Sequence, residues 1–199
     1  MNRFVIVPIV EGQSEVASVP VLLRRLLSKR QRHDVTIARP VRVHRTSVVK
    51  EGEIERAVAL ARRNREGCDA VLVLLDADDD CPAELGPKLL NRIKKGHGDL
   101  SAVAVVLPKR EFEGWFLGSL QSLRGVRGIA ADASSPPNPE EIRGAKERLS
   151  EFMVSKRTYV ETTDQPALAA KFDLNLARKR CPSFDKFMRD FERLINLRK

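Results

Sequence analysis

Short runs of consecutive apolar residues alternate with segments whose apolar residues recur every three or four positions. The runs predict buried strands, because they are rich in Val and Leu and are bounded by polar residues; they are Phe4–Val10, Pro40–His44, Ala70–Leu75 and Ala102–Leu107. The segments between and after them predict helices, which follow Ser14 and cover Glu53–Asn64, Leu85–Ile93 and Phe112–Leu120. This alternation indicates an α/β fold with a mostly parallel sheet of about four strands covered by helices.

The first predicted helix contains two local signals near its start. Ser14 belongs to the residue types that cap helix N-termini. Pro20 lacks a backbone N–H and removes a hydrogen bond early in the helix. We therefore expect Ser14 to cap the helix, and we expect either a kink or a late start at Pro20.

The pattern changes after residue 130. Ala131–Glu140, "ADASSPPNPE", is rich in turn-forming residues and predicts a loop or linker. Further helices are predicted over Glu141–Ser155, Ala167–Leu176 and Ser183–Leu197. We therefore expect three parts: an α/β domain over residues 1–130, a linker over 131–140, and a mainly helical C-terminal region over 141–199 packed on the domain.

Charge is distributed unevenly along the 199-residue chain, whose formal net charge is +9 at pH 7. Residues 1–50 and 141–199 have an excess of Lys and Arg, whereas residues 51–140 have an excess of Asp and Glu. A basic protein favours an anionic partner, above all nucleic acid, although a basic surface without such a partner is the alternative. An acidic middle between basic flanks fits a metal centre whose rim attracts phosphate.

The three cysteines, Cys68, Cys81 and Cys181, are widely spaced and form no CxxC pair. Their number and spacing argue against a zinc site and against a disulfide scaffold, and they favour a reducing cytoplasm. The apolar run Val5–Val10 is too short to cross a bilayer and lacks a small-residue cleavage site. We therefore expect neither a signal peptide nor a transmembrane helix, and no membrane partner.

Two of the predicted strands end directly in acidic residues. Glu11 follows the first strand, and Asp76, Asp78 and Asp80 follow the third. Because ligands of an open parallel sheet bind at the carboxyl ends of its strands, we expect these carboxylates to converge. Carboxylates crowded together need a cation, and a set of oxygen ligands without His or Cys favours Mg²⁺ or Mn²⁺. The alternative is that these aspartates form an acidic turn that caps the next helix.

The segment "PKREFEGWF" follows the fourth strand. Glu111 is a candidate for a second metal site, and Lys109 or Arg110 is a candidate for holding a phosphate. The alternative is that Glu111 and Glu113 only open a helix, where anions suit the helix dipole, and that Trp115 packs in the core.

Two basic segments near the end of the chain are further candidates. Arg178, Lys179 and Arg180 form a basic run that either contacts a nucleic-acid backbone or is a solvated helix end. The segment that contains Tyr159 precedes a threonine-rich loop. That loop either lies over the acidic crevice or plays no part there.

Four motifs in order, "VEGQSE", "LLDADDD", "KREFEGWFLG" and "CPSFDKF", resemble the Toprim-like DUF4276 family, which is related to the Toprim domains of OLD-type nucleases. The resemblance covers roughly residues 3–195. It implies a Toprim-like fold and a metal-dependent, nuclease-like site. In that site Glu11 is the general acid/base or a metal-linked carboxylate, and Asp76 and Asp78 are metal ligands. It also implies a link to anti-phage defence, since some members lie beside ABC-type ATPases.

The prediction is therefore a metal-dependent phosphodiesterase acting on DNA or RNA. Its catalytic residues are Glu11, Asp76 and Asp78, and its further metal ligands are Asp80 and Glu111. The alternative is a non-catalytic binding or regulatory subunit of an ATPase-containing complex. Phosphatases also use Asp-x-Asp after a strand, but normally after the first strand, where this chain has Glu11. The choice between DNA and RNA, the ATPase partner and the formation of a homo-oligomer stay open.

Overall fold

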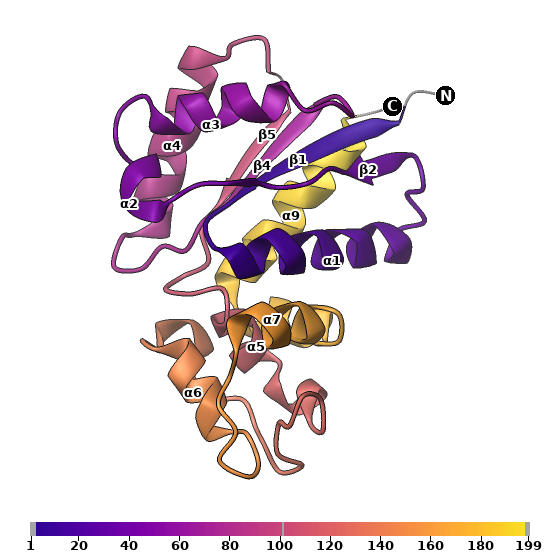
Figure 1. Ribbon diagram of the computed structural model, residues 1–199, viewed down its shortest axis with the longest axis vertical. Helices are drawn as coiled ribbons and strands as arrows, with labels where there is room; N and C mark the ends of the chain where they lie inside the picture. Colours follow the sequence, from indigo (N-terminus) through magenta and orange to yellow (C-terminus); the bar gives the residue numbers. More distant parts are fainter. Residues whose placement is uncertain (1–2, 101, 198–199) are drawn as a thin grey trace.

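The protein is built on one parallel sheet (Figure 1). The computed structural model describes residues 3–100 and 102–197. The strands run in the order β2-β1-β4-β5, and β3 also pairs with β1; they are β1 (Phe4–Val10), β2 (Val35–Ile37), β3 (Val41–Arg42), β4 (Ala70–Leu74) and β5 (Val103–Val106). The predicted class, an α/β fold with a parallel sheet covered by helices, is confirmed.

Helices cover both faces of the sheet, which explains why the strands are continuously apolar. Successive side chains of a strand point to opposite faces, so Ile6 belongs to one apolar cluster, whereas Val5 and Val7 belong to the other. Figure 1 shows the two helical layers: α1 (Gln13–Lys29) and α9 (Pro182–Asn196) on one face, and α3 (Glu53–Arg62) and α4 (Pro82–Gly96) on the other.

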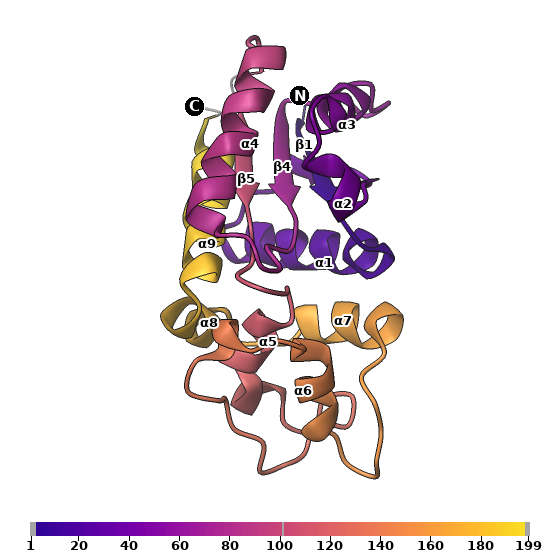
Figure 2. The same ribbon diagram turned by 90° about the vertical axis from the view of Figure 1, so that its left-hand side faces the viewer.

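A second group of helices lies across the edge of the sheet at which the strands end (Figures 1 and 2). It contains α5 (Gly114–Gly118), η1 (Leu120–Leu123), η2 (Pro139–Glu141), α6 (Ala145–Glu151), α7 (Glu161–Ala169) and α8 (Leu174–Arg180); the short α2 (Arg45–Val48) lies instead beside α3. We call this group the helical cap. Helix α7 packs along α1, and the fully buried Trp115 of α5 packs against Phe184 of α9.

The second predicted strand, Pro40–His44, is wrong in its bounds. Two short strands, β2 and β3, share the same side of β1, where Phe4 is opposite Val35 and Val10 is opposite Arg42. Strands of two or three residues are too short for a hydrophobic pattern to reveal, and pairing with β1 stabilises them. The predicted helix Ala167–Leu176 is wrong as well, because the chain breaks it into α7 and α8.

The predicted start of the first helix also needs correction. Helix α1 begins at Gln13 with Gly12 at its N-cap, so Ser14 lies inside the first turn and does not cap it. Pro20 lies within the helix, so the late start is wrong and the kink is the alternative that remains. Burial of Leu22 and Leu23 against the sheet outweighs the single backbone hydrogen bond that Pro20 removes.

The segment between the sheet and the C-terminal helices is largely a loop, as predicted. Residues 131–138 form neither helix nor strand, and η2 follows them. One apolar cluster includes residues before and after this loop, because α9 returns to the sheet. The predicted division into three parts at residues 131–140 stays a prediction. The first part starts and the third part ends in residues 1–2 and 198–199, which lie outside the described residues. Within the described residues, no helix is both long and apolar enough to cross a membrane.

Candidate active site between the sheet and the helical cap

The parallel register brings the ends of three strands to one edge of the sheet. Val10 of β1 is opposite Leu74 of β4, and Leu74 is opposite Val106 of β5. Glu11 and Asp76, which follow these strands by one and two residues, therefore lie at the same edge, facing the helical cap. Asp76 also ties two strand ends together, since its Oδ1 accepts a hydrogen bond from the Phe112 N–H at 2.8 Å.

Four acidic side chains gather at this edge: Glu11, Glu15, Asp76 and Glu113. We call them the carboxylate cluster. Glu15 comes from the first turn of α1, and Glu113 is the N-cap residue of α5. Glu15 is 9% exposed and Glu113 is fully buried. The pKa of Asp76 is raised well above its usual value by burial first, and then by the negative charges of Glu113, Glu15 and Glu11.

Gln165 of α7 holds two of these carboxylates in place. Its Nε2 donates to Glu15 Oε1 at 2.8 Å and to Glu113 Oε1 at 3.1 Å, and its Oε1 accepts from Ser18 Oγ at 2.5 Å. The hydroxyl of Tyr159 also donates to Glu113 Oε1, at 2.9 Å. The segment after Tyr159 that was predicted to be a threonine-rich loop is instead the start of α7, and α7 lies over the crevice together with Tyr159.

The other oxygens of these carboxylates have no such donor. Within the described residues, Oε2 of Glu11, Glu15 and Glu113 is buried and has no hydrogen-bond partner. Buried polar atoms are almost always hydrogen-bonded, because leaving one without a partner costs about 1–3 kcal/mol. Three such oxygens in one place are therefore the strongest chemical anomaly of the structure.

Burial and mutual repulsion favour the protonated form of two of the glutamates. The pKa of Glu11 is raised to about 7, mainly by burial and then by the charge of Asp78, while Arg45 opposes the shift. The pKa of Glu113 is also raised to about 7 by burial, although nearby Lys146 lowers it. Both side chains thus exchange protons near neutral pH in the absence of a cation.

Lys146 of α6 is a cation whose charge acts on three members of the cluster, Glu11, Asp76 and Glu113. Burial lowers its pKa, but the charges of Glu113, Glu161 and Asp76 outweigh burial, so the net pKa is raised and the amine stays protonated. Its Nζ lies 2.7 Å from Glu161 Oε1. One ammonium group offsets only part of the negative charge of the four carboxylates.

The remaining aspartates of "DADDD" point outwards and bind arginines. Asp78, which has a left-handed backbone (φ 51°), is exposed, and its Oδ2 lies 3.9 Å from Arg45 Nε. Buried Arg45 fastens this turn, because it pairs with Asp80 and donates to the Asp76 carbonyl at 2.8 Å. Asp79, the next residue, lies 2.6 Å from Arg110 Nη1.

Several predicted ligands have local partners instead. Glu111 Oε1 accepts from the backbone N–H of Ala145, at 3.0 Å, at the start of α6. Asp80 is engaged by Arg45, as described. Of the predicted ligands, the structure therefore brings Glu11 and Asp76 into the cluster and Asp78 to its exposed side, while Asp80 and Glu111 bind elsewhere. Their metal roles stay predictions.

The predicted nucleic-acid contacts are also largely engaged within the protein. Lys109 pairs with Glu141, Arg110 with Asp79, and Arg178 with Asp185, whereas Arg180 donates to the carbonyl of Pro136 and Lys179 is exposed. A groove of about 910 Å³ is lined by three of them, Lys109, Arg110 and Arg180, together with Asp78. This groove adjoins the outward-facing aspartates rather than the carboxylate cluster.

The donor set nevertheless fits a hard cation. In the described parts of the chain, no three His, Cys, Asp or Glu side chains are placed to hold one ion as they stand. Carboxylates without a cation repel one another, so an ion would be held by three of them only after side-chain rotation brought their oxygens together. Its buried Oε2 atoms and its all-oxygen chemistry suit Mg²⁺ or Mn²⁺.

Sequence reasoning missed several members of this site. Glu15 lies four residues after Glu11 in "VEGQSE", and a helix starting at Gly12 turns it back toward the strand end. Glu113 follows the fourth predicted strand, but the sequence favours the opening of a helix over a role in the site for this residue. Lys146 and Gln165 had no local signal at all, because they come from helices whose docking on the sheet only the tertiary fold determines.

The fold and the site together define an α/β protein with a buried acidic centre at the carboxyl edge of a parallel sheet. The chain belongs to the family described as Domain of unknown function (DUF4276), which it matches over residues 10–192. The predicted family is thus confirmed. No curated protein sequence matches the chain.

One solved structure is similar to this protein over most of its length. It is the C-terminal region of the OLD protein of Xanthomonas campestris pv. campestris, with a TM-score of 0.48 and 16% sequence identity. The match covers 96% of this chain and 96% of that one.

Proposed function

We propose that this protein is a divalent-metal-dependent phosphodiesterase that cleaves nucleic acid at the carboxylate cluster. One observation carries the proposal: Oε2 of Glu11, Glu15 and Glu113 is buried without a hydrogen-bond partner within the described residues, next to Asp76. A cation held by Glu15, Asp76 and Glu113 would satisfy two of these oxygens and reduce the repulsion between the four charges, which leaves Glu11 Oε2 for a water molecule. The resemblance of the strand-end motifs to Toprim nucleases supports a phosphodiester as the substrate.

The metal ligands in this proposal are Glu15, Asp76 and Glu113, with Asp78 at the exposed side, and Glu11 stays free to act on a water molecule. Asp80, which binds Arg45, and Glu111, which binds the Ala145 N–H, are not among the ligands that the cluster itself supplies. A bound Mg²⁺ or Mn²⁺ would supply a Lewis acid for the phosphate oxygens and lower the pKa of a water molecule.

Glu11 is the proposed general base. Its Oε2 has no hydrogen-bond partner in the described structure, and its pKa of about 7 suits proton exchange at neutral pH. In the reaction, Glu11 Oε2 takes the proton of the water that attacks phosphorus. Gln165 orients the partner carboxylates through their Oε1 atoms, and protonated Lys146 offsets part of the negative charge that the substrate adds.

The test is the substitution Glu11→Gln, which keeps the size of the side chain but removes its charge and basicity. We expect cleavage of DNA or structured RNA, measured with Mg²⁺ or Mn²⁺, to fall by roughly two to four orders of magnitude, while nucleic-acid binding is retained. Glu84→Gln, which changes an exposed glutamate of α4, is the matched control and leaves cleavage unchanged. A Glu11→Gln variant that cleaves as fast as the parent contradicts the assigned role.

The alternative function, a non-catalytic binding or regulatory subunit of an ATPase-containing complex, predicts a different result. In that case the protein binds Mg²⁺ at the cluster but cleaves neither DNA nor RNA, also when an ABC-type ATPase partner is added. The context that the family resemblance implies is anti-phage defence. A cytoplasmic location and a homo-oligomer stay predictions.

A further inference from the structure

Four exposed arginines lie along one edge of the sheet and differ from many other arginines of the protein, which form ion pairs with carboxylates. Arginines elsewhere are matched by acids, as in the pairs of Arg92 with Glu55 and of Arg127 with Asp164. Within residues 3–100 and 102–197, no carboxylate forms an ion pair with the four; they are Arg3, Arg24, Arg39 and Arg42. We call these four residues the arginine edge.

The arginine edge follows the outer side of β1. Strands β2 and β3 both pair with that side, and Arg39 lies in the connection between them. Arg24 reaches the same edge from α1, since its Nη2 donates to the Ile37 carbonyl at 3.3 Å. The four guanidinium groups therefore belong to one side of the molecule, although they come from separate segments of the chain.

One end of the arginine edge meets the carboxylate cluster. Arg42 is opposite Val10, the last residue of β1. Its Nε donates to the backbone carbonyl of Glu11 at 3.3 Å, and its Nη1 donates to Gln13 Oε1 at 3.4 Å. These neutral acceptors leave the charge of Arg42 available beside the site.

The other end of the arginine edge opens into a hollow of about 610 Å³. Arg3, Arg24 and Arg39 line it, and Glu66 is the acidic residue of its lining. Its walls also include apolar side chains of α1 and of the segment around β2. Three guanidiniums against one carboxylate make this hollow a surface for an anion.

We propose that the arginine edge binds the sugar–phosphate backbone of a nucleic-acid strand and leads it to the carboxylate cluster. This inference rests on the proposed function. A cluster of carboxylates repels a polyanion, so positive charge beside it is needed for docking. Guanidinium groups bind phosphates through paired hydrogen bonds, and those of the arginine edge need not break an ion pair to do so.

The length of the arginine edge fits a nucleic-acid backbone. Arg39 and Arg42 are three residues apart in a nearly extended segment, which spans about 10 Å. One strand of a duplex has a phosphate roughly every 3.4 Å of helix axis, so this segment spans about three phosphates. The basic run at Arg178 is a poorer surface, since Arg178 would have to leave Asp185.

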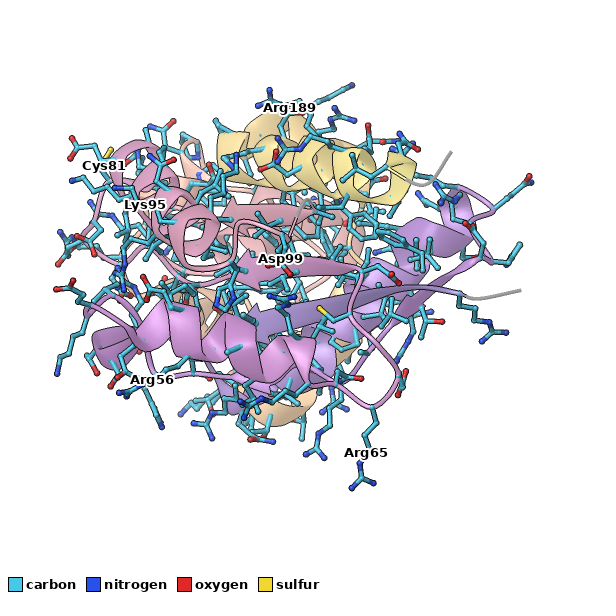
Figure 3. The ribbon with its side chains drawn as sticks, turned by 90° about the horizontal axis from the view of Figure 1, so that it is seen from above. Arg56, Arg65, Cys81, Lys95, Asp99 and Arg189 are labelled. Atoms are coloured by element: carbon cyan, nitrogen blue, oxygen red, sulfur yellow. The ribbon has the colours of Figure 1, made fainter. Side chains whose placement is uncertain are left out.

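The experiment compares two double substitutions in a Glu11→Gln background, which prevents turnover. Arg39→Gln with Arg42→Gln removes two charges from the arginine edge. Lys94→Gln with Lys95→Gln removes two charges from the last turn of α4, which packs on β5 at the opposite edge of the sheet (Figure 3). Affinity for a DNA duplex and for a structured RNA is measured with Mg²⁺ over a salt series.

We expect the arginine variant to bind about five- to tenfold more weakly per lost charge near 0.1 M salt. The slope of log affinity against log salt should fall by about 0.7–0.9 per arginine. The lysine variant should match its parent. An unchanged Mg²⁺-induced rise in melting temperature in the arginine variant would show that the carboxylate cluster is intact, so that the weaker binding is a loss of contact.

Equal binding by the two double variants overturns the inference and leaves the proposed function standing. A parent that is stabilised by Mg²⁺ but binds no nucleic acid overturns the inference as well. A parent that is not stabilised by Mg²⁺ and also binds no nucleic acid overturns the inference and the proposed function together. Binding of both variants to anionic lipid vesicles is measured as well. If the arginine variant lost vesicle binding but kept nucleic-acid binding, the arginine edge would be a membrane-binding surface and the inference would be overturned.

Discussion

The two groups of acids at the end of β1 and β4 differ in what surrounds them. Asp79 and Asp80 are exposed, and each pairs with an arginine. Glu15 and Glu113 are buried, and each keeps one oxygen without a partner in the described structure. The group that is most conspicuous in the sequence, "DADDD", thus contributes mainly Asp76 to the interior, while its other members face solvent.

This difference shows that the number of acidic residues in a segment does not identify a metal-binding site. An exposed aspartate beside an arginine is solvated and paired, so it gains little from a cation. A buried glutamate without a donor for one oxygen gains a great deal. Burial together with a missing partner is therefore the better criterion, and each of the following substitutions tests it.

The largest effect is expected for Asp76→Asn, which keeps an acceptor for the Phe112 N–H but removes the charge. The parent should gain about 2.7 kcal/mol of unfolding free energy when Mg²⁺ is present at a hundred times its dissociation constant. Asp76→Asn should lose most of this gain, as measured by thermal or denaturant unfolding with and without Mg²⁺.

Asp80→Asn is the matched control for that comparison. It removes a carboxylate four residues away that pairs with Arg45. We expect it to lower the stability of the metal-free protein slightly but to keep the Mg²⁺-induced gain. If Asp80→Asn abolished the gain and Asp76→Asn kept it, the exposed group would be the metal site and the comparison would be reversed.

The pH dependence of the metal-free protein should show the next largest effect. The pKa values of Glu11 and Glu113 are raised by folding to about 7, from an ordinary value of 4.5. The folded protein therefore binds more protons than the unfolded chain between pH 4.5 and 7, and its stability falls as the pH rises through that window. We expect a loss of unfolding free energy across this pH range, measured by denaturant unfolding at several pH values.

Other acidic residues change the unfolding free energy outside the range between pH 4.5 and 7. Hydrogen bonding to Arg92 lowers the pKa of Glu55, so the stability that Glu55 contributes is lost only as the pH falls below about 4.5. Saturating Mg²⁺ should reduce the loss between pH 5 and 8, because the cation competes with protons for the cluster. Stability that rises over this range without metal would argue against the buried charges.

A smaller effect is expected for Glu15→Gln. This substitution removes one of the charges that raise the pKa of Asp76, and it keeps an oxygen that can accept from Gln165. The metal-free protein should become more stable by about 1 kcal/mol, measured by denaturant unfolding. Glu53→Gln, in the first turn of α3 and outside the carboxylate cluster, should change stability little. An equal gain in this control would contradict the assignment of the Glu15→Gln gain to the cluster.

The smallest effect is expected for Asp78→Asn in the absence of metal. Asp78 is exposed, lies 3.9 Å from Arg45 and has a left-handed backbone, which Asn tolerates well. We expect a change of about 0.5 kcal/mol or less in unfolding free energy. A large loss would instead identify Asp78 as a structural partner of Arg45.

The sequence predicted the parts of this molecule that depend on neighbouring residues. The four apolar runs predicted the parallel sheet, and the acids after two of them predicted which strand ends meet. Glu11 and Asp76 could be placed in this way because the carboxyl ends of neighbouring parallel strands lie at the same edge of a sheet. The short strands β2 and β3 could not, since only pairing with β1 gives them their structure.

The donors that complete the site could not be predicted for a related reason. Ser18 and Glu15 contact Gln165 across sequence separations of 147 and 150 residues. Contacts over such distances depend on how α7 docks along α1, and no periodicity in either segment encodes that docking. The sequence therefore suggested where the acids lie but not which atoms of them lack partners.

The position of Gln165 determines when the site can be completed during translation. Gln165 follows Glu113 by 52 residues, so a ribosome has already made all four acids when the amide that orients two of them is still untranslated. At about 5–20 residues per second, that interval lasts several seconds. During it the sheet can form, but the acids lack their donors. The proposed hydrolytic activity would therefore arise only late in translation, after Gln165 has been added and α7 has packed along α1.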